Sequence, residues 1–480
     1  MGRLLGTLVS AALVGVSPAW AAGGFSLPFD SVGASGMGFA GVDAADYDPG
    51  AAVRNPALHG LALESGLATG AHFAHLSTQF QGVAVREGTD GSTISGGNSG
   101  RSGRVDAPIP DWTWTRRMSD RFAVGVTLAA PYGTSQHRDA DWKGRYNAID
   151  TVIRGIELTP GAAWQVTPRL RVGVGARLHW FDFEYSNDVD LGAIVQREVE
   201  ARAGADLATP ACALAGEETL PGKYDFRHRA EASRFTAAWQ AGLRMALTDQ
   251  VAVGLSYLSP IEHGLHGDAT RQRLGWTLED FENDPCFSTT RVALLATGGS
   301  FEEEVVALVR AATTDTGFGL TLTLPETLSS GVAWTVDRWT FASSLRWTRW
   351  SRFDEVIIRF DNATPTVRSR LEFQDAYLVA LGMRYQLNER WTLSAGVAGE
   401  SAAVSDENRS ATSADAGRLY LTGGFSWVVN ERRTVDFSTG VLRSRGGEVD
   451  DVDPMTGNRV TGRYQPLTLL WFGLRMRWRL

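Results

Sequence analysis

Apolar and polar residues alternate along much of this chain with a period of two, which places successive side chains on opposite faces of a β-strand. Across positions 170–180, apolar residues occupy every second position, with arginine, glycine and histidine between them. The last residues, 470–480, repeat the pattern with Arg475, Arg477 and Arg479 on the polar face. If the apolar face met a protein core, these arginines would lie on the solvent side. If it met lipid, they would line a polar lumen.

Repetition of the pattern favours lipid. We find about fourteen such segments, and an even number of antiparallel strands is typical of bacterial barrels. The sequence therefore predicts an all-β fold, an antiparallel transmembrane β-barrel of about 14 strands. Besides the two segments above, the predicted strands are 66–80, 109–117, 122–130, 153–166, 235–247, 251–263, 321–336, 339–360, 376–387, 391–400, 420–429 and 435–442.

The connections alternate between short and long, which gives the predicted barrel two different ends. Short polar turns of the hairpin kind are found at 167–169, 248–250, 388–390 and 430–432. Long loops are predicted at about 187–230 and 266–319, and both contain apolar residues at helical spacing. Tryptophans near strand ends fit the aromatic girdles of a barrel. They include Trp112, Trp114, Trp339, Trp347, Trp350 and Trp478.

The amino-terminal residues differ from the rest. Residues 1–22 read as a secretory signal peptide, with Arg3 before an apolar stretch and a small-x-small cleavage site at 19–21. No later window approaches the roughly 20 apolar residues of a membrane-spanning helix. Residues 23–64 are rich in glycine, alanine and aspartate and lack the strand period, so we expect a compact hatch, or plug, in the wide lumen. Residues 65–480 are predicted to form the barrel with its long loops.

Composition narrows the list of partners. The net charge is −8 and no concentrated basic patch is present, so nucleic acid is not an expected partner. The chain has two cysteines, Cys212 and Cys286, in a protein with an export signal. Both fall in the predicted long loops on the same side of the barrel. A disulfide between them is one prediction for an oxidising compartment, and two unpaired thiols are the other.

Short motifs occur in the order and spacing of a known family. The stretches at 24–27 (GFSL), 35–38 (SGMG) and 53–58 (VRNPAL) come first, followed by 130–133 (APYG), 141–146 (DWKGRY), 322–327 (LTLPET), 347–353 (WTRWSRF), 373–377 (FQDAY) and 408–410 (NRS). Almost from end to end, the chain resembles the FadL family of outer-membrane transporters for long-chain fatty acids and other hydrophobic compounds. The resemblance implies a monomeric barrel with an amino-terminal hatch, passive diffusion of the substrate, and lateral release through an opening in the barrel wall.

The resemblance also suggests site residues. Phe25 matches the aromatic residue near the mature amino terminus that reaches the ligand pocket, although Phe25 as an anchor of the hatch is the alternative. Asn55, Pro56 and Ala57 match the hatch motif, where proline fixes φ. A fatty-acid carboxylate needs a basic partner, because burial of an unpaired charge is costly. Arg368 and Arg370 lie near one position where the family has such a residue.

Two departures from the family pattern stand out. Asn187 aligns with the other expected basic position and cannot neutralise a carboxylate, which leaves neutral or aromatic hydrocarbons as an alternative substrate class. The chain ends in Leu480, whereas barrels of this kind end in an aromatic residue read by the assembly machinery; Trp478 lies on the same face. We also find no proline within 122–130 that would mark a kink in the third strand.

Other function classes receive less support. No G-x-S-x-G motif and no metal-binding histidine spacing is present, so an outer-membrane enzyme is not expected and neither a cofactor nor a metal is predicted. A nonspecific porin fits poorly with a plug segment and apolar loop helices. The predicted partners are a hydrophobic small molecule, outer-membrane lipid with lipopolysaccharide, and the barrel assembly machinery of a Gram-negative bacterium.

Overall fold

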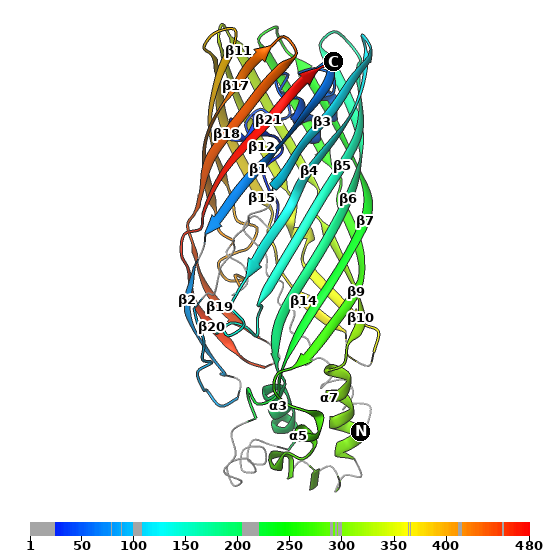
Figure 1. The fold of residues 1–480 in the computed structure, drawn as a ribbon, viewed down its shortest axis with the longest axis vertical. Helices are drawn as coiled ribbons and strands as arrows, with labels where there is room; N and C mark the ends of the chain where they lie inside the picture. The colour runs from blue at the N-terminus through cyan, green and yellow to red at the C-terminus, as the bar shows by residue number, and fades with distance from the viewer. Residues whose placement is uncertain are drawn as a thin grey trace.

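A tall, closed barrel of antiparallel β-strands dominates the computed structural model (Figure 1). The described residues are 25–77, 79–87, 89–98, 108–203, 220–288, 291–292, 295, 300–362, 364, 366–410, 415–453 and 456–480. The predicted signal peptide, residues 1–22, lies outside them. Among the described residues, no helix is long and apolar enough to cross a membrane.

The barrel wall crosses from one end to the other fourteen times, which confirms the predicted fold. Most crossings are single strands: β1 (Ser65–Ser77), β3 (Pro108–Ser119), β4 (Phe122–His137), β5 (Asp150–Gln165), β6 (Leu170–Asp190), β7 (Asp225–Ala246), β16 (Trp391–Glu400), β17 (Arg418–Asn430), β18 (Arg433–Ser444) and β21 (Thr468–Arg479). The others are pairs of segments: β8 (Val251–Leu258) with β9 (Ile261–Arg273), β10 (Thr316–Leu324) with β11 (Thr327–Val336), β12 (Trp339–Thr348) with β13 (Glu355–Phe360), and β14 (Val367–Arg370) with β15 (Ala376–Gln386). The first crossing, β1, pairs with both β3 and the last crossing, β21, and so closes the ring.

The wall is apolar outside and polar inside over much of its height. On β6, Val174 is 64% exposed on the outer surface, whereas Arg177 is fully buried inside. On β21, Leu470 and Leu474 face outward, whereas Arg475 is buried. A surface of this kind suits hydrocarbon rather than water, because a soluble protein would bury these apolar side chains.

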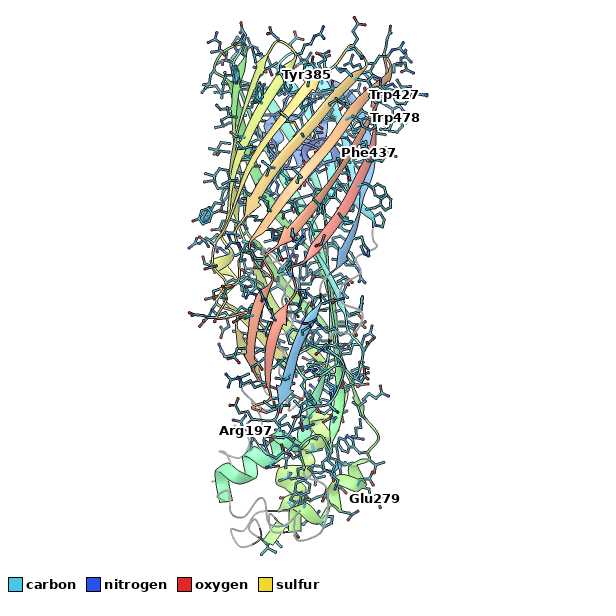
Figure 2. All side chains as sticks on the ribbon, turned by 90° about the vertical axis from the view of Figure 1, so that its left-hand side faces the viewer. Arg197, Glu279, Tyr385, Trp427, Phe437 and Trp478 are labelled. Atoms are coloured by element: carbon cyan, nitrogen blue, oxygen red, sulfur yellow. The ribbon has the colours of Figure 1, made fainter. Side chains whose placement is uncertain are left out.

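Aromatic side chains gather on the outer surface near the end where the chain finishes, and Figure 2 shows Tyr385, Trp427, Phe437 and Trp478 there. The rings of Trp339 and Tyr385 pack 4.4 Å apart. Their position agrees with an interfacial girdle. The prediction was wrong for Trp350, which is buried inside the barrel.

At this end of the barrel, called the turn end below, the predicted short turns are stabilised by their first polar side chain. The hydroxyl of Thr167 accepts hydrogen bonds from the backbone of Arg169 and Leu170, and Thr248 acts in the same way in the next such turn. The side-chain oxygens of Asn388 and Asn430 accept from the backbone two residues further on. These local bonds fix the strand-to-strand connection without tertiary help.

The amino-terminal segment, residues 25–64, folds inside the ring of strands. It contains the helix α2 (Val32–Ser35) and the 3-10 helices η1 (Pro49–Val53) and η2 (Pro56–Leu58). Ser31, Asp48 and Asn55 cap these helices with their side chains, and proline begins η1 and η2, where its missing N–H is not needed. The sequence motif at 55–57 therefore has a local role: it starts η2.

Polar contacts join this segment to strands all around the ring. Asp43 accepts hydrogen bonds from Ser256 on β8, at 2.5 Å, and from Ser329 on β11, at 2.7 Å. The backbone N–H of Gly41 donates to Ser344 on β12, and Asn55 donates to the carbonyl of Leu243 on β7. The expected segment is therefore positioned to fill the cross-section of the barrel.

Glycines on the inner wall make room for this segment. A Cβ atom at Gly173, Gly242, Gly254, Gly382 or Gly396 would collide with the segment's backbone or with Asn55. The segment itself uses Gly38, at φ +64, where it passes Val397 and Gly396 on β16. The glycine content of the chain thus serves close approach of two backbones as well as turns.

At the opposite end, called the loop end, several strands continue further than predicted. β6 continues to Asp190 and β7 begins at Asp225; β9 continues to Arg273 and β10 begins at Thr316. The predicted loop boundaries, 187–230 and 266–319, were therefore too wide. The reason is that the alternation changes phase: inward positions become apolar and outward positions become charged, so the lipid-facing pattern disappears while the strand goes on.

Helices and a small sheet cover the loop end. The helices are α3 (Leu191–Ala203), α5 (Leu278–Glu282) and α7 (Ala307–Ala312), with the 3-10 helix η3 (Pro285–Phe287) and the π-helical turn η4 (Glu302–Val306); Figure 1 shows the labelled helices grouped below the strands. A three-stranded sheet joins β2 (Phe80–Val85), β20 (Arg459–Tyr464) and β19 (Gly447–Val452). Cys286 lies buried in η3, whereas Cys212 lies outside the described residues, so the disulfide stays a prediction.

Replacement of Gly396 by valine should displace the hatch, because the new side chain would meet the backbone of Met37 and Gly38. We expect a loss of roughly 1–3 kcal/mol of stability, as for other overpacked interiors, and a higher ionic conductance in planar bilayers. Gly399→Val, on the same strand with open space around its Cβ position, is the matched control. Equal conductance of the two variants would contradict a close contact.

Peptide mapping under non-reducing conditions should recover one peptide pair that contains Cys212 and Cys286, because an exported protein meets an oxidising environment. Complete alkylation of both cysteines without prior reduction would contradict this expectation.

Candidate functional site

A continuous apolar cluster fills the barrel between the hatch and the loop end. Its side chains come from β5, β6, β7, β9, β10 and β13 and from the adjoining loops. They include Ile153, Phe181, Phe183, Tyr185, Ala230, Ala232, Leu265, Ala269, Phe318, Leu320, Leu322, Trp350, Phe353, Val356, Ile358 and Phe373. An apolar molecule that lies among these side chains gains about 25 cal/mol for each Å² that it removes from water.

The change of phase on β6 shows how the cluster arises. Residues at odd positions face inward along the whole strand: Arg177 and His179 are followed by Phe181 and Phe183, all buried. The outward positions change in the opposite sense, from apolar residues to Asp182 and Glu184. Asp182 forms an ion pair with Arg154 at 2.5 Å, on a surface that faces water. The alternation at 170–180 does not predict that the strand continues, because the apolar and polar faces are exchanged after it. The sequence analysis therefore missed Phe181 and Phe183 as inward-facing residues.

Phe25 closes the cluster on the hatch side. It is 1% exposed, and its ring packs against Trp350 at 5.0 Å, Tyr132 at 5.7 Å and Phe181 at 6.2 Å. Trp350 begins the 3-10 helix η5 (Trp350–Arg352), at the loop-end side of β12. The residue predicted to reach the ligand pocket thus ends the apolar lumen, and it is also an anchor of the hatch.

The backbone around Phe25 lies against an irregularity in β4. Ala130 and Pro131 together stand opposite the single residue Ile156 of β5, which is a β-bulge. β3 pairs with β4 only as far as Ala129, although Pro108 and Pro110 still pair with β1. Prolines at 108 and 110 also deprive this end of β3 of two N–H donors.

The amino-terminal chain takes the place of β3 at this point. The N–H of Gly133 donates to the carbonyl of Phe25, and the N–H of Leu27 donates to the carbonyl of Pro131, both at 2.8 Å. The third crossing of the barrel is therefore irregular. The sequence analysis missed this because it ended the strand at residue 130, one residue before the proline.

A polar layer separates the apolar cluster from the hatch. Arg177 and Glu157 form a fully buried ion pair at 2.8 Å. The rings of His179 and His263 share a hydrogen bond at 3.0 Å, and Nε2 of His179 has no partner among the described residues. The amide nitrogen and oxygen of the buried Gln240 side chain also have no hydrogen-bond partner among the described residues. Buried polar groups of this kind normally hold water.

Ion pairs hold the hatch to the wall. The fully buried guanidinium of Arg475 contacts Asp48 of the hatch at 2.8 Å, Asp436 of β18 at 2.9 Å and Asp111 of β3 at 3.2 Å. On the other side of the hatch, Asp30 joins Arg54 and Arg346, each at 2.7 Å. Arg475 and Arg477 of the last strand thus meet carboxylates of the hatch and wall, whereas Arg479 is exposed.

Arg368, one of the two predicted basic residues, does not lie at the apolar cluster. Arg368 on β14 is exposed and pairs with Glu355 at 3.4 Å. Arg370 ends the same strand opposite Glu355, and its side chain lies outside the described part of the structure. Asn187 is buried on β6 and donates to the carbonyls of Tyr146 and Asp188. The structure therefore brings Phe25, but neither Arg368 nor Asn187, to the candidate site.

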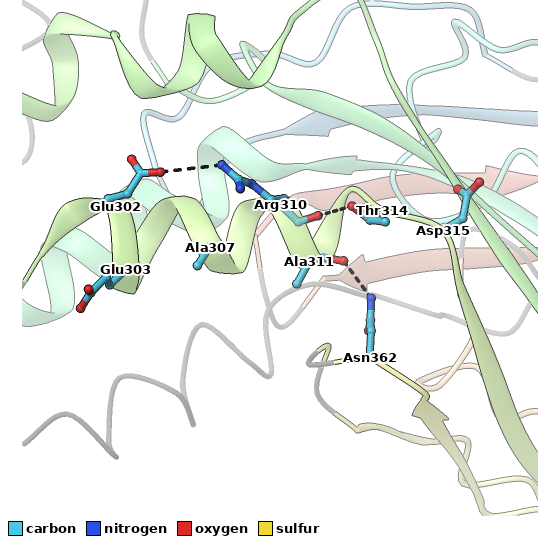
Figure 3. Close-up of a pocket in the computed structure, with 8 residues that line it drawn as sticks. All are labelled: Glu302, Glu303, Ala307, Arg310, Ala311, Thr314, Asp315 and Asn362. Carbon is cyan, nitrogen blue, oxygen red and sulfur yellow. Dashed lines mark hydrogen bonds and ion pairs between the residues drawn. The ribbon is translucent and has the colours of Figure 1, made fainter.

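A separate pocket of about 480 Å³ opens on the loop end, and Figure 3 shows its lining. Glu302, Glu303 and Asp315 make it acidic, while Arg310 pairs with Glu302 at 3.7 Å. Three carboxylates in the lining make this pocket a poor place for an anionic molecule such as a fatty acid. In the described residues, no group of three or more histidine, cysteine or acidic residues could hold a metal ion.

Comparison with known proteins finds relatives along nearly the whole chain. The family described as "Outer membrane protein transport protein (OMPP1/FadL/TodX)" matches residues 13–477. A long-chain fatty acid transport protein of Salmonella typhi is 24% identical over 444 residues, which cover 90% of either chain.

Two solved structures share the fold. A FadL homologue of Pseudomonas aeruginosa has a TM-score of 0.77 at 20% identity, covering 95% of this chain and 99% of that one. The toluene transporter TodX of P. putida has a TM-score of 0.59 at 14% identity, covering 93% and 98%.

Proposed function

The chain belongs to the OMPP1/FadL/TodX family of outer membrane transport proteins, and we propose that it carries hydrophobic small molecules across the outer membrane by passive diffusion, with long-chain fatty acids as its main substrates. The observation that carries the proposal is the apolar cluster enclosed by a closed barrel and ended by Phe25. The Salmonella typhi relative is named a long-chain fatty acid transport protein.

The proposed path begins at the loop end and runs along the apolar cluster to Phe25. There the hatch blocks the straight route, because ion pairs and close glycine contacts fill the cross-section. The β-bulge of β4 supports a lateral exit, since β3 leaves β4 at this level and, among the described residues, the chain at 25–27 pairs with that edge of β4 in its place. Movement of that short segment would uncover a route into the membrane.

Neutral and aromatic hydrocarbons are a second candidate class. The observation in their favour is that Asn187, where a basic residue was expected, is an amide engaged with two backbone carbonyls. One structural relative is a toluene transporter. A substrate without charge would need only the apolar cluster.

Phe25→Ala should weaken the binding of palmitate and of hexadecane alike, because it removes aromatic contacts at the end of the path. We expect a loss of roughly tenfold, the equivalent of one or two aromatic pairs. Native mass spectrometry of the detergent-purified barrel measures both complexes. Phe235→Ala, which removes a ring 76% exposed on the lipid-facing wall, is the control. Unchanged binding by the Phe25 variant would show that the path does not reach this residue.

Deletion of Ala130 should abolish release but not binding. One residue then faces Ile156, and the inward and outward positions on both sides of the bulge keep their directions. Uptake of radiolabelled palmitate by cells that carry only this transporter should fall to background, while the purified barrel still retains palmitate. Pro131→Ala keeps the length of the strand and serves as the control. Normal uptake by the deletion variant would argue for an exit elsewhere.

A further inference from the structure

Arg271 is a buried arginine that borders the apolar cluster and forms no ion pair with a carboxylate in the part of the chain that the structure describes. It lies near the loop end of β9, is 6% exposed, and its guanidinium stacks over the ring of Phe360 at 4.9 Å. Nη1 donates to the carbonyl of Ala311 and to the hydroxyl of Thr364, each at 3.0 Å. Nε and Nη2 are buried and have no hydrogen-bond partner among the described residues.

Several other arginines inside this barrel are neutralised by a carboxylate, whereas buried Arg171 donates to hatch carbonyls and to the amide of Gln165. Arg177, Arg346 and Arg475 each contact a carboxylate within 3 Å. Asp315 is close enough to attract the guanidinium of Arg271, but the hydrogen bond between the two residues comes from the backbone N–H of Arg271, and the described residues show no ion pair between their side chains. Burial of a guanidinium whose Nε and Nη2 groups make no hydrogen bond has a large desolvation cost, which an anionic ligand would offset.

His228 stands beside this guanidinium. It lies directly opposite Arg271 in the β7–β9 register, is 1% exposed, and its ring centroid is 6.4 Å from that of Phe360. Nδ1 of His228 also lacks a partner among the described residues. Two unsatisfied polar side chains on neighbouring strands thus face the same aromatic ring, which is the arrangement that a group with two oxygens requires.

The apolar cluster starts at this pair and runs away from it. Along β9, Ala269 and Leu265 face inward between Arg271 and His263, and the opposing β10 contributes Phe318, Leu320 and Leu322. His263 stacks on Phe181, which contacts Phe25. Eight residues of strand span roughly 26 Å. An extended hydrocarbon chain advances roughly 1.3 Å per carbon–carbon bond of about 1.5 Å, so this length corresponds to about 20 bonds, a chain of about 21 carbons.

We propose that Arg271, with His228 beside it, holds the carboxylate of a long-chain fatty acid whose tail lies along β9 and ends at Phe25. The inference rests on the proposed function and adds the residue that selects an acid over a neutral hydrocarbon. It replaces Arg368 in that role, because Arg368 is exposed and already paired with Glu355.

The test is competition between palmitate and 1-hexadecanol, which share a tail and differ in charge, for the purified barrel in native mass spectrometry. Wild type should retain more palmitate than hexadecanol. Arg271→Met should lower the ratio of the two complexes at least tenfold, as expected for lost hydrogen bonds to a charged group. Arg271→Lys, which keeps the charge, should recover part of the ratio.

The control is Arg368→Gln, which should leave the ratio unchanged. Arg271→Met is chosen because an apolar side chain of similar length removes a buried unpaired charge and should fold at least as well as wild type; retained hexadecanol binding reports that it has folded. An equal ratio in wild type and Arg271→Met would overturn the inference while transport of hydrophobic molecules stands. Failure of wild type to retain either ligand would instead count against the proposed function and, with it, this inference.

Discussion

Backbone hydrogen bonding around a closed ring is the constraint on which the rest of this structure depends. Hydrocarbon offers no partner for an N–H or C=O group, so a strand can lie in the membrane only if both its edges are paired. The ring of crossings from β1 to β21 satisfies this condition almost everywhere. The pairing is interrupted where Ala130 and Pro131 form the bulge of β4 and β3 no longer pairs with β4. That the chain at 25–27 supplies the missing partner there explains how a weak point in the wall remains closed.

The hatch is held by interactions that can be exchanged for water. Buried ion pairs around Arg475 and Asp30, together with hydrogen bonds from Asp43, join it to the wall, while wall glycines let the two backbones approach. A buried ion pair adds little net stability over apolar packing, because its desolvation cost is large, but it fixes position sharply. A plug attached in this way stays in register when closed, and movement of its amino-terminal residues exposes the ring of Phe25.

Along the lumen, the distribution of charge describes a path with two ends. The outer end carries Arg271 and His228, whose unsatisfied N–H groups lie beside Phe360, and the inner end carries Phe25 and Trp350 above the layer of Arg177, His179 and Gln240. Between them, the side chains are those of the apolar cluster together with His263. A long molecule with one anionic end can contact both ends of this path at once, whereas a small neutral molecule can contact only the apolar part. The charge of the ligand is therefore recognised at Arg271 and its length by the distance from there to Phe25.

The sequence by itself determined the membrane-facing half of this protein, because apolar side chains toward lipid and polar side chains toward the lumen alternate at every second residue of a strand. This alternation is visible at 170–180 and 470–480. The turns that begin with Thr167 or Asn388 likewise depend only on neighbouring residues in the sequence. The tertiary structure alone decided the rest. β6 continues past Trp180 with the opposite phase, so its aromatic lining could not be recognised without knowing where the membrane ends. Whether an arginine is paired depends on residues far apart in the chain. Arg475 meets Asp48 and Asp111, and Arg368 meets Glu355, whereas Arg271 pairs with no carboxylate among the described residues. The register of the strands and the position of the hatch decide these partners, not the spacing of residues in the sequence.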